Sequence, residues 1–376
     1  MKITGIHTVG LYGATPEGGW DQELRSDDNI HTLLAITMSE GVTGYGSAFT
    51  GVELVRAAVR VLEPLLLGES AIEPERVSEK LHQNTFWLGR GGTFTHAISA
   101  IDIALWDVLG KVTGQPISRL LGGRYRERVR PYASILMREP EPLADHLGEL
   151  LGLGFRAFKL GWGPFGRHSS TLDEQIIATA REAVGDSAQL MVDAGGSDAF
   201  WPHGYKWALR TSQMLAEYDV TWFEEPLKPD ALEDYVLLRE HSLVPIAGGE
   251  VLTRRQAFTP WLQRQAFDIV QPDVTKVGGI SEQRRIAWMA NDNGVRMIPH
   301  GWNTAVGLAA DLQLASAFSD TDYVEYLMGS HYIDDISARK WELDEDGMLA
   351  IPDGPGLGFE LDHDALGRFT RGETLP

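Results

Sequence analysis

The sequence predicts an α/β fold in which a (β/α) barrel follows a smaller α+β domain. Three observations lead to this prediction. The chain has 376 residues, more than one typical domain, whereas (β/α) barrels run to roughly 250 residues as single units. Short apolar runs alternate with helical segments from about residue 129 onward. Polar residues close five of those runs, as expected where a barrel carries its chemistry at the strand ends.

Composition limits the class of protein and its partners. Hydrophobic residues make up 43% and charged residues 23%, which is typical of a soluble globular protein. The 53 acidic and 33 basic residues give a net charge of −20, which repels phosphate backbones and anionic lipids. We therefore expect no nucleic acid partner and no membrane partner. The chain has no cysteine, which excludes disulfides, thiolate metal sites and cysteine nucleophiles. The amino terminus lacks the apolar segment of a signal peptide, and a cytoplasmic location is expected.

The amino-terminal region predicts the smaller domain. Strand-like runs cover residues 3–9, 33–39 and 44–48, and Glu40-Gly41 forms a turn between the last two. Two helical stretches follow. In the second, apolar residues recur at helical spacing, at Ile98, Ile101, Leu105, Val108 and Val112. We assign residues 1–125 to this α+β domain.

Residues 126–345 are expected to form the barrel. Each gap between the centres of neighbouring apolar runs is 23 to 33 residues, which leaves room for the crossover helix that parallel strands require. A doubly wound open sheet is the alternative, but it does not need so even a repeat. Residues 346–376 include a segment rich in proline and glycine, so we expect an extended tail that packs back on the first domain. The eight runs centre near Tyr132, Phe158, Met191, Trp222, Ile246, Ile269, Met297 and Val324.

Three acids close consecutive apolar runs: Asp193, Glu224 and Glu250. On consecutive barrel strands their carboxylates converge, and they repel one another unless they are protonated or bound to a cation. All-oxygen ligation suits Mg²⁺, with Mn²⁺ as the alternative, better than Zn²⁺. The competing interpretation is that these are ordinary capping or salt-bridge acids at loop starts.

Four further residues close neighbouring runs. His300 closes the seventh run and Asp273 the sixth, so Asp273 can accept from one ring nitrogen and leave the other to take a proton. Glu325 lies in the eighth run, where it either stays protonated and donates to a substrate oxygen or forms a structural salt bridge. Lys159 ends the second run and is expected to act electrostatically, although a solvated lysine is the usual case.

These motifs together resemble the mandelate racemase and muconate lactonizing family of the enolase superfamily. The resemblance implies a (β/α)7β-type TIM barrel under an amino-terminal capping domain that the carboxyl-terminal tail completes. It also implies that Glu224, not Glu225, binds the metal, and that the pair His300 and Asp273 belongs to the mandelate racemase subgroup. It covers nearly the whole chain and rests on the helix 101–107, the Leu120-Leu121-Gly122-Gly123 turn, Glu224-Glu225-Pro226 and Pro355-Gly356-Leu357-Gly358.

The chemistry that the resemblance implies begins with a metal-bound substrate carboxylate, whose α-proton a base removes to give an enediolate. Members of the subgroup often carry a second lysine two residues after the position of Lys159, and here that position is Gly161. Racemisation uses two bases, one on each face of the substrate, and the second of these is therefore missing. We expect β-elimination of water from a sugar acid, with His300 as base and then acid. A cycloisomerase of a lactone or anhydro-sugar acid is the first alternative, and a racemase or epimerase the second.

Two other classes of protein fit the strand ends less well. A metal-dependent hydrolase barrel would carry pairs of histidines there, and a non-catalytic binding protein has no need of a His–Asp pair beside a metal. The expected partner is a small carboxylate, a sugar acid, and the chain is expected to form a homo-oligomer. A cap loop over residues 13–25 is expected to fold over the barrel mouth. The candidate substrate contacts are Trp20, Arg25, Arg90, Trp162, Trp302 and Asn303, with Trp87 as a further one.

Overall fold

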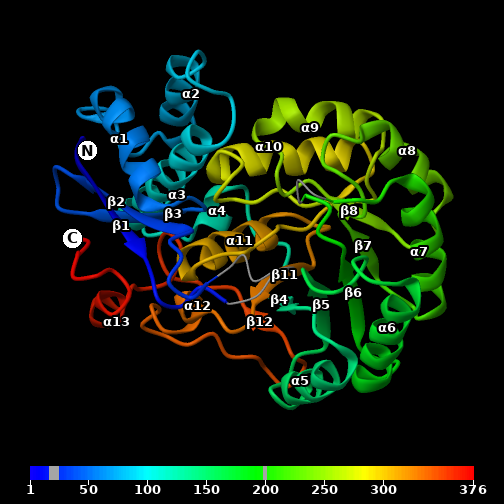
Figure 1. The fold of residues 1–376 in the computed structure, drawn as a ribbon. Helices are drawn as coiled ribbons and strands as arrows, with labels where there is room; N and C mark the ends of the chain where they lie inside the picture. Colours follow the sequence, from blue (N-terminus) through cyan, green and yellow to red (C-terminus); the bar gives the residue numbers. More distant parts are fainter. Residues whose placement is uncertain (17–24, 198–200) are drawn as a thin grey trace.

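The computed structural model describes residues 1–16, 25–197 and 201–376. Figure 1 shows a small cap formed by the amino-terminal segment, a larger ring of strands and helices beside it, and the carboxyl-terminal segment returning to the cap. The two chain ends lie on the cap side of the molecule.

The cap contains a three-stranded antiparallel sheet in the order β1-β2-β3. Its strands are β1 (Ile3–Leu11), β2 (His31–Met38) and β3 (Thr43–Ala48). The helices are α1 (Val52–Leu66), α2 (Pro74–Asn84) and α3 (Thr93–Thr113), followed by the short α4 (Ile117–Leu120).

Helix α3 packs directly on β3, and the sequence of β3 explains why. A Cβ atom at Gly46 would lie 1.8 Å from the carbonyl oxygen of Ala100, and one at Gly44 would lie 2.1 Å from that of Ala104. Only glycine permits this approach of strand to helix. The close packing fixes the helix that carries the cap's contacts with the barrel.

Eight parallel strands form the second sheet, in the order β10-β9-β8-β7-β6-β5-β4-β11. The first barrel strand pairs with the last, and the Thr321 hydroxyl donates to the Met297 carbonyl at 2.8 Å to link the remaining gap between β10 and β11. All eight predicted centres lie in strands, which confirms the barrel. The strands are β4 (Arg128–Leu136), β5 (Ala157–Gly161), β6 (Gln189–Asp193), β7 (Trp222–Glu224), β8 (Ile246–Gly248), β9 (Ile269–Val270), β10 (Arg296–Met297) and β11 (Tyr323–Leu327).

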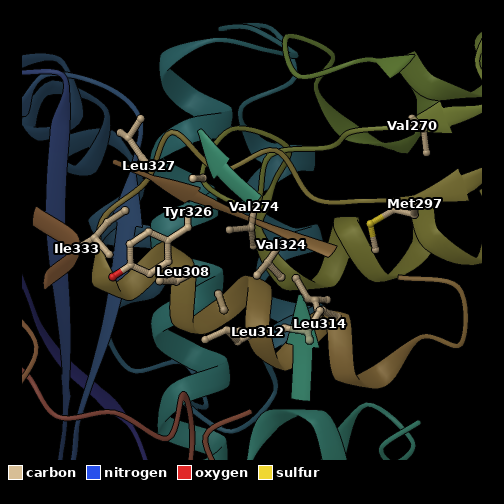
Figure 2. Close-up of a cluster of buried hydrophobic side chains, with 14 of the residues drawn as sticks. Val270, Val274, Met297, Leu308, Leu312, Leu314, Val324, Tyr326, Leu327 and Ile333 are labelled. Atoms are coloured by element: carbon tan, nitrogen blue, oxygen red, sulfur yellow. The ribbon is translucent and has the colours of Figure 1, made fainter. Parts of the chain in front are cut away.

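Helices alternate with these strands and cover the outside of the barrel (Figure 1). Figure 2 shows how their apolar faces pack: Leu308, Leu312 and Leu314 lie beside Val324, and all four belong to the largest buried cluster. No helix in the described ranges is long and apolar enough to cross a membrane. The helices are α5 (Pro140–Gly152), α6 (Ser170–Val184), α7 (Tyr205–Glu217), α8 (Leu232–His241), α9 (Arg254–Gln263), α10 (Gly279–Asp292) and α11 (Ala305–Ala317).

The carboxyl-terminal tail joins the barrel to the cap. Helix α12 (His331–Asp334) precedes the tail, which contains β12 (Leu349–Ala350) and α13 (His363–Gly367). Strand β12 pairs antiparallel with β4. The Asp107 carboxylate on α3 accepts from the backbone N–H of Leu357 at 2.9 Å and from that of Tyr45 at 3.0 Å. This one buried acid therefore links the tail to the cap sheet.

Candidate active site

The three predicted metal ligands meet at one end of the barrel. Asp193 is the last residue of β6 and Glu224 the last of β7, where the two residues lie in register. Glu250 follows β8 by two residues, after Gly249 with its positive φ of 111°. One carboxylate oxygen from each of the three lies within 4.8 Å of the others, and all three side chains are buried.

The electrostatics of this triad favour a bound cation. Burial, together with the negative charge of Glu224, raises the pKa of Asp193 well above its ordinary value. Glu224 accepts from the Trp222 indole N–H at 2.9 Å and from the Gln271 amide at 2.7 Å, so its position is fixed. Three buried oxygen donors that repel one another fit a hard divalent ion such as Mg²⁺.

Asp273 and His300 form the predicted pair. They follow β9 and β10 and are joined by a parallel bridge, and His300 Nδ1 lies 2.8 Å from Asp273 Oδ2. The other oxygen of Asp273 accepts from the backbone N–H and the hydroxyl of Thr275 at 2.7 and 2.6 Å. Burial opposes ionisation of Asp273, but the charge of Lys276 and the contact with His300 outweigh it and lower its pKa to about 2. The surroundings thus favour the carboxylate form of Asp273, which orients the imidazole.

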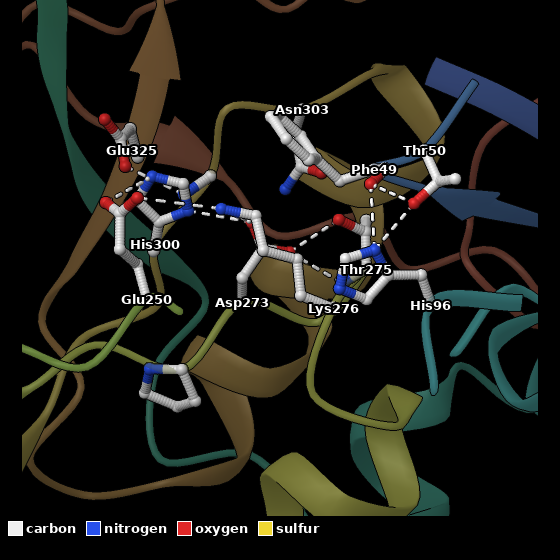
Figure 3. A network of polar contacts seen from close by, with 12 residues as sticks. Phe49, Thr50, His96, Glu250, Asp273, Thr275, Lys276, His300, Asn303 and Glu325 are labelled. Atoms are coloured by element: carbon white, nitrogen blue, oxygen red, sulfur yellow. Dashed lines mark hydrogen bonds and ion pairs between the residues drawn. The ribbon is translucent and has the colours of Figure 1, made fainter. Parts of the chain in front are cut away.

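The histidine also contacts the metal triad. Its Nε2 atom lies 2.9 Å from Glu250 Oε2, and Figure 3 shows the ring between Glu250 and Asp273. Burial lowers the pKa of His300, yet the charge of Glu250 outweighs burial and the pKa is raised well above its ordinary value. An ion held by Glu250 would compete with His300 for this carboxylate, so metal binding and proton transfer at His300 are coupled.

Lys159 and Glu325 form a buried ion pair beside the triad. The Lys159 ammonium lies 2.6 Å from Glu224 Oε1 and 2.9 Å from Glu325 Oε1. Glu325 Oε2 accepts from the Gly301 N–H at 2.7 Å and from the Tyr132 hydroxyl at 3.2 Å. Burial raises the pKa of Glu325, but the charges of Lys159 and His300 prevail and lower it. Of the two interpretations of Glu325, the structure shows the salt bridge, with Lys159.

A small pocket opens among these residues. The residue at the end of β5 on its wall is Gly161, and a Cβ atom added there would lie 3.0 Å from the Cβ of Asp193. The wall therefore has no side chain at the position of the second lysine described above. The Asp193 side chain partly fills the space beside Gly161. The described wall consists of Ser134, Ile135, Leu136, Lys159, Gly161, Trp162, Asp193, His300, Trp302 and Glu325.

The predicted substrate contacts divide into two groups. Trp162 and Trp302 line the pocket, with ring centroids 6.4 Å apart. Arg25 and Arg90 are exposed, and neither belongs to the described pocket wall. Asn303 is buried, donates to Asp311 at 2.8 Å, and is not one of the described wall residues.

The last two candidates are Trp20 and Trp87. Trp20, in the predicted cap loop, lies outside the described residues. Trp87 is 91% exposed and packs against Phe86.

Three residues near the site were missed by the sequence interpretation. Lys276 is buried, lies 3.7 Å from both Glu250 and Asp273, and places its ammonium over the Phe49 ring of the cap. Tyr132 and Ser134 lie two residues apart on β4, and period-two alternation along that strand could have indicated a shared face. Lys276 had no comparable signal, because its position depends on the turn after Asp273.

Two family models match the chain. The model described as enolase C-terminal domain-like matches residues 143–365, and the model of the mandelate racemase / muconate lactonizing enzyme N-terminal domain matches residues 26–122.

Similar proteins extend over nearly the whole chain. The D-galactarolactone cycloisomerase of Agrobacterium fabrum is 35% identical, over 98% of this chain and 99% of that protein. The arabinonate dehydratase of Saccharolobus solfataricus is 33% identical, over 87% of each chain. The crystal structure of the 3,6-anhydro-D-galactonate cycloisomerase from Zobellia galactanivorans superposes with a TM-score of 0.88 at 29% identity and covers 98% of this chain and 99% of that one.

Proposed function

Because this chain belongs to the mandelate racemase and muconate lactonizing enzyme family of the enolase superfamily, we propose that it is a Mg²⁺-dependent dehydratase of a sugar acid. The reaction removes the proton α to the substrate carboxylate and then expels the β-hydroxyl as water, giving a 2-keto-3-deoxy acid. Asp193, Glu224 and Glu250 would hold the ion, which supplies positive charge to stabilise the enediolate.

His300 is the proposed base. Asp273 faces Nδ1, and Nε2 faces the triad. An ion held by Glu250 would free Nε2 from that carboxylate, and the neutral ring, with its proton on Nδ1, could then receive the α-proton at Nε2. The same nitrogen then returns this proton to the departing hydroxyl when both groups lie on one face of the substrate. Lys159 carries its charge at the triad and is placed to stabilise charge that develops on the carboxylate oxygens.

The glycine at position 161 is the observation that favours elimination over racemisation. Inversion at Cα needs a second proton donor on the face opposite His300, and no side chain exists at the position where such a base is usual. Elimination from one face needs only His300. The paired lysine, Lys159, is already engaged by Glu224 and Glu325.

A cycloisomerase is the second candidate, favoured by the cycloisomerases among the similar proteins. It needs the same α-proton transfer, but the leaving oxygen belongs to a ring of the substrate. The two reactions differ in mass balance, because dehydration loses one water and ring opening gives an isomer.

The test is incubation of the purified protein with Mg²⁺ and a panel of sugar acids and their lactones. Semicarbazide detects 2-keto acids, and mass spectrometry separates loss of water from isomerisation. Turnover of at least one acid by the wild type, lost in His300→Asn and in Glu224→Gln, is expected. Either no 2-keto acid from the whole panel, or full turnover by His300→Asn, would refute the proposal.

A further inference from the structure

The indole N–H of Trp302 is a buried donor without an acceptor. Trp302 follows His300 by two residues on the loop before α11, and its side chain lies in the pocket wall. The Nε1 atom is buried and has no hydrogen-bond partner among the residues that the structure describes. Leaving such a donor unpaired costs about 1–3 kcal/mol, and a buried group of this kind calls for an explanation. A ligand oxygen in the pocket supplies one.

The second tryptophan of the wall is held in a strained conformation. Trp162 directly follows Gly161 at the end of β5 and has a φ of +55°. A left-handed backbone at a residue other than glycine costs about 1–3 kcal/mol and persists where the surrounding structure enforces it, often at ligand sites. The planes of the two indoles are inclined by 57°. Together they give the pocket an apolar wall that carries the unpaired indole donor of Trp302.

The cationic side chains of the described pocket wall are already paired with carboxylates. Among the described wall residues the basic side chains are Lys159 and His300. Lys159 pairs with Glu224 and Glu325, and His300 with Glu250 and Asp273. The described wall residues therefore offer no unpaired cation to a second carboxylate, whereas the two indoles suit C–H surfaces and neutral hydroxyls.

We propose that Trp162 and Trp302 form the subsite for the distal carbons of a sugar monocarboxylate, with Trp302 Nε1 donating a hydrogen bond to a neutral hydroxyl. This inference rests on the proposed function, because that function places the substrate carboxylate at the metal triad. The subsite selects polyhydroxylated acids with one carboxylate over short acids, because short acids leave the Trp302 indole N–H unpaired.

The test measures binding in the His300→Asn protein with Mg²⁺, so that turnover does not interfere. Isothermal titration compares D-galactonate, D-xylonate and D-arabinonate with glycerate, which carries the carboxylate end but lacks the distal carbons. Adding Trp302→Phe keeps a ring and removes only the donor. For the tightest sugar acid it should weaken the Kd about 3- to 10-fold, as expected for one neutral hydrogen bond. The glycerate Kd should stay within about twofold, and this also reports that the site is folded.

Trp288→Phe is the matched control, since Trp288 is 48% exposed on α10 and packs against Phe318. It should leave every Kd unchanged. In a ¹H–¹⁵N spectrum, the indole signal that Trp302→Phe removes should move downfield when the sugar acid is added to the His300→Asn protein.

Three results would overturn the inference. These are an unchanged sugar-acid Kd in Trp302→Phe, an equal loss for glycerate, and failure of all three sugar acids to bind more tightly than glycerate. Failure of the proposed function is separate: the sugar acid would bind as described, and the wild type would release no 2-keto acid.

Discussion

Replacing Asp273 with Asn tests the orientation of the proposed base. Asp273 is fully buried, its Oδ2 lies 2.8 Å from His300 Nδ1, and its other oxygen is held by Thr275. With Thr275 still donating to the amide oxygen, the amide NH₂ of Asn faces Nδ1. The imidazole must then accept at Nδ1 and carry its proton on Nε2, where it no longer acts as a base.

The size of the effect follows from the bond that is lost. A hydrogen bond to a charged group contributes about 1.5–3 kcal/mol, and 1.36 kcal/mol corresponds to a factor of ten. We expect Asp273→Asn to reduce kcat by at least about 10-fold and by roughly 150-fold at the upper end of that range. KM should change little, because Asp273 is absent from the described pocket wall.

The assay is initial-rate kinetics on the acid that the wild type turns over. Asp353→Asn is the control, an acid-to-amide change at a residue whose side chain is 65% exposed and pairs with Arg119 and Arg124. It should leave kcat unchanged. A kcat for Asp273→Asn within twofold of the wild type would refute the role given to the pair.

Three further predictions concern the metal, the cap and the missing base. Mg²⁺ at 100 times its Kd should stabilise the wild type by about 2.7 kcal/mol; Glu224→Gln should abolish this gain in thermal melts, and an equal gain in the variant would contradict the metal site. Asp102 lies between α3 and α10, and burial raises its pKa from 3.8 to about 7 although Ser281 donates to it. The folded state then keeps a proton that the unfolded state releases, so stability should fall between about pH 4 and pH 7 by at most about 4 kcal/mol. Urea unfolding at pH 5 and pH 8 should show this fall in the wild type and not in Asp102→Asn, and equal falls would contradict it. Gly161→Lys should not create an epimerase, because its Cβ would press on Asp193; weaker Mg²⁺ binding is expected in titrations, and inversion at C2 in NMR spectra would contradict the prediction.

The sequence sufficed for those parts of the site that depend on strand ends. Asp193 and Glu224 end apolar runs, and in a parallel barrel the ends of neighbouring strands lie side by side, so the triad could be predicted from order alone. The pair of Asp273 and His300 follows from the same rule.

The salt bridge of Glu325 could not be predicted in this way. Its partner is Lys159, 2.9 Å away but on a strand far removed in sequence. Lys276 is a similar case, because a turn after Asp273 directs its side chain to Glu250 and to Phe49 of the cap. Arg25 and Arg90 are absent from the described pocket wall, and their role in substrate binding stays a prediction.

Proton transfer from a single face is the central claim, and the reaction in D₂O tests it most directly. The wild type, Mg²⁺ and an accepted sugar acid are followed by ¹H NMR to partial conversion. We expect a 2-keto-3-deoxy product with deuterium at C3, and remaining substrate with unchanged configuration at C2. Substrate inverted and deuterated at C2 would contradict the claim, because it requires a second base opposite His300.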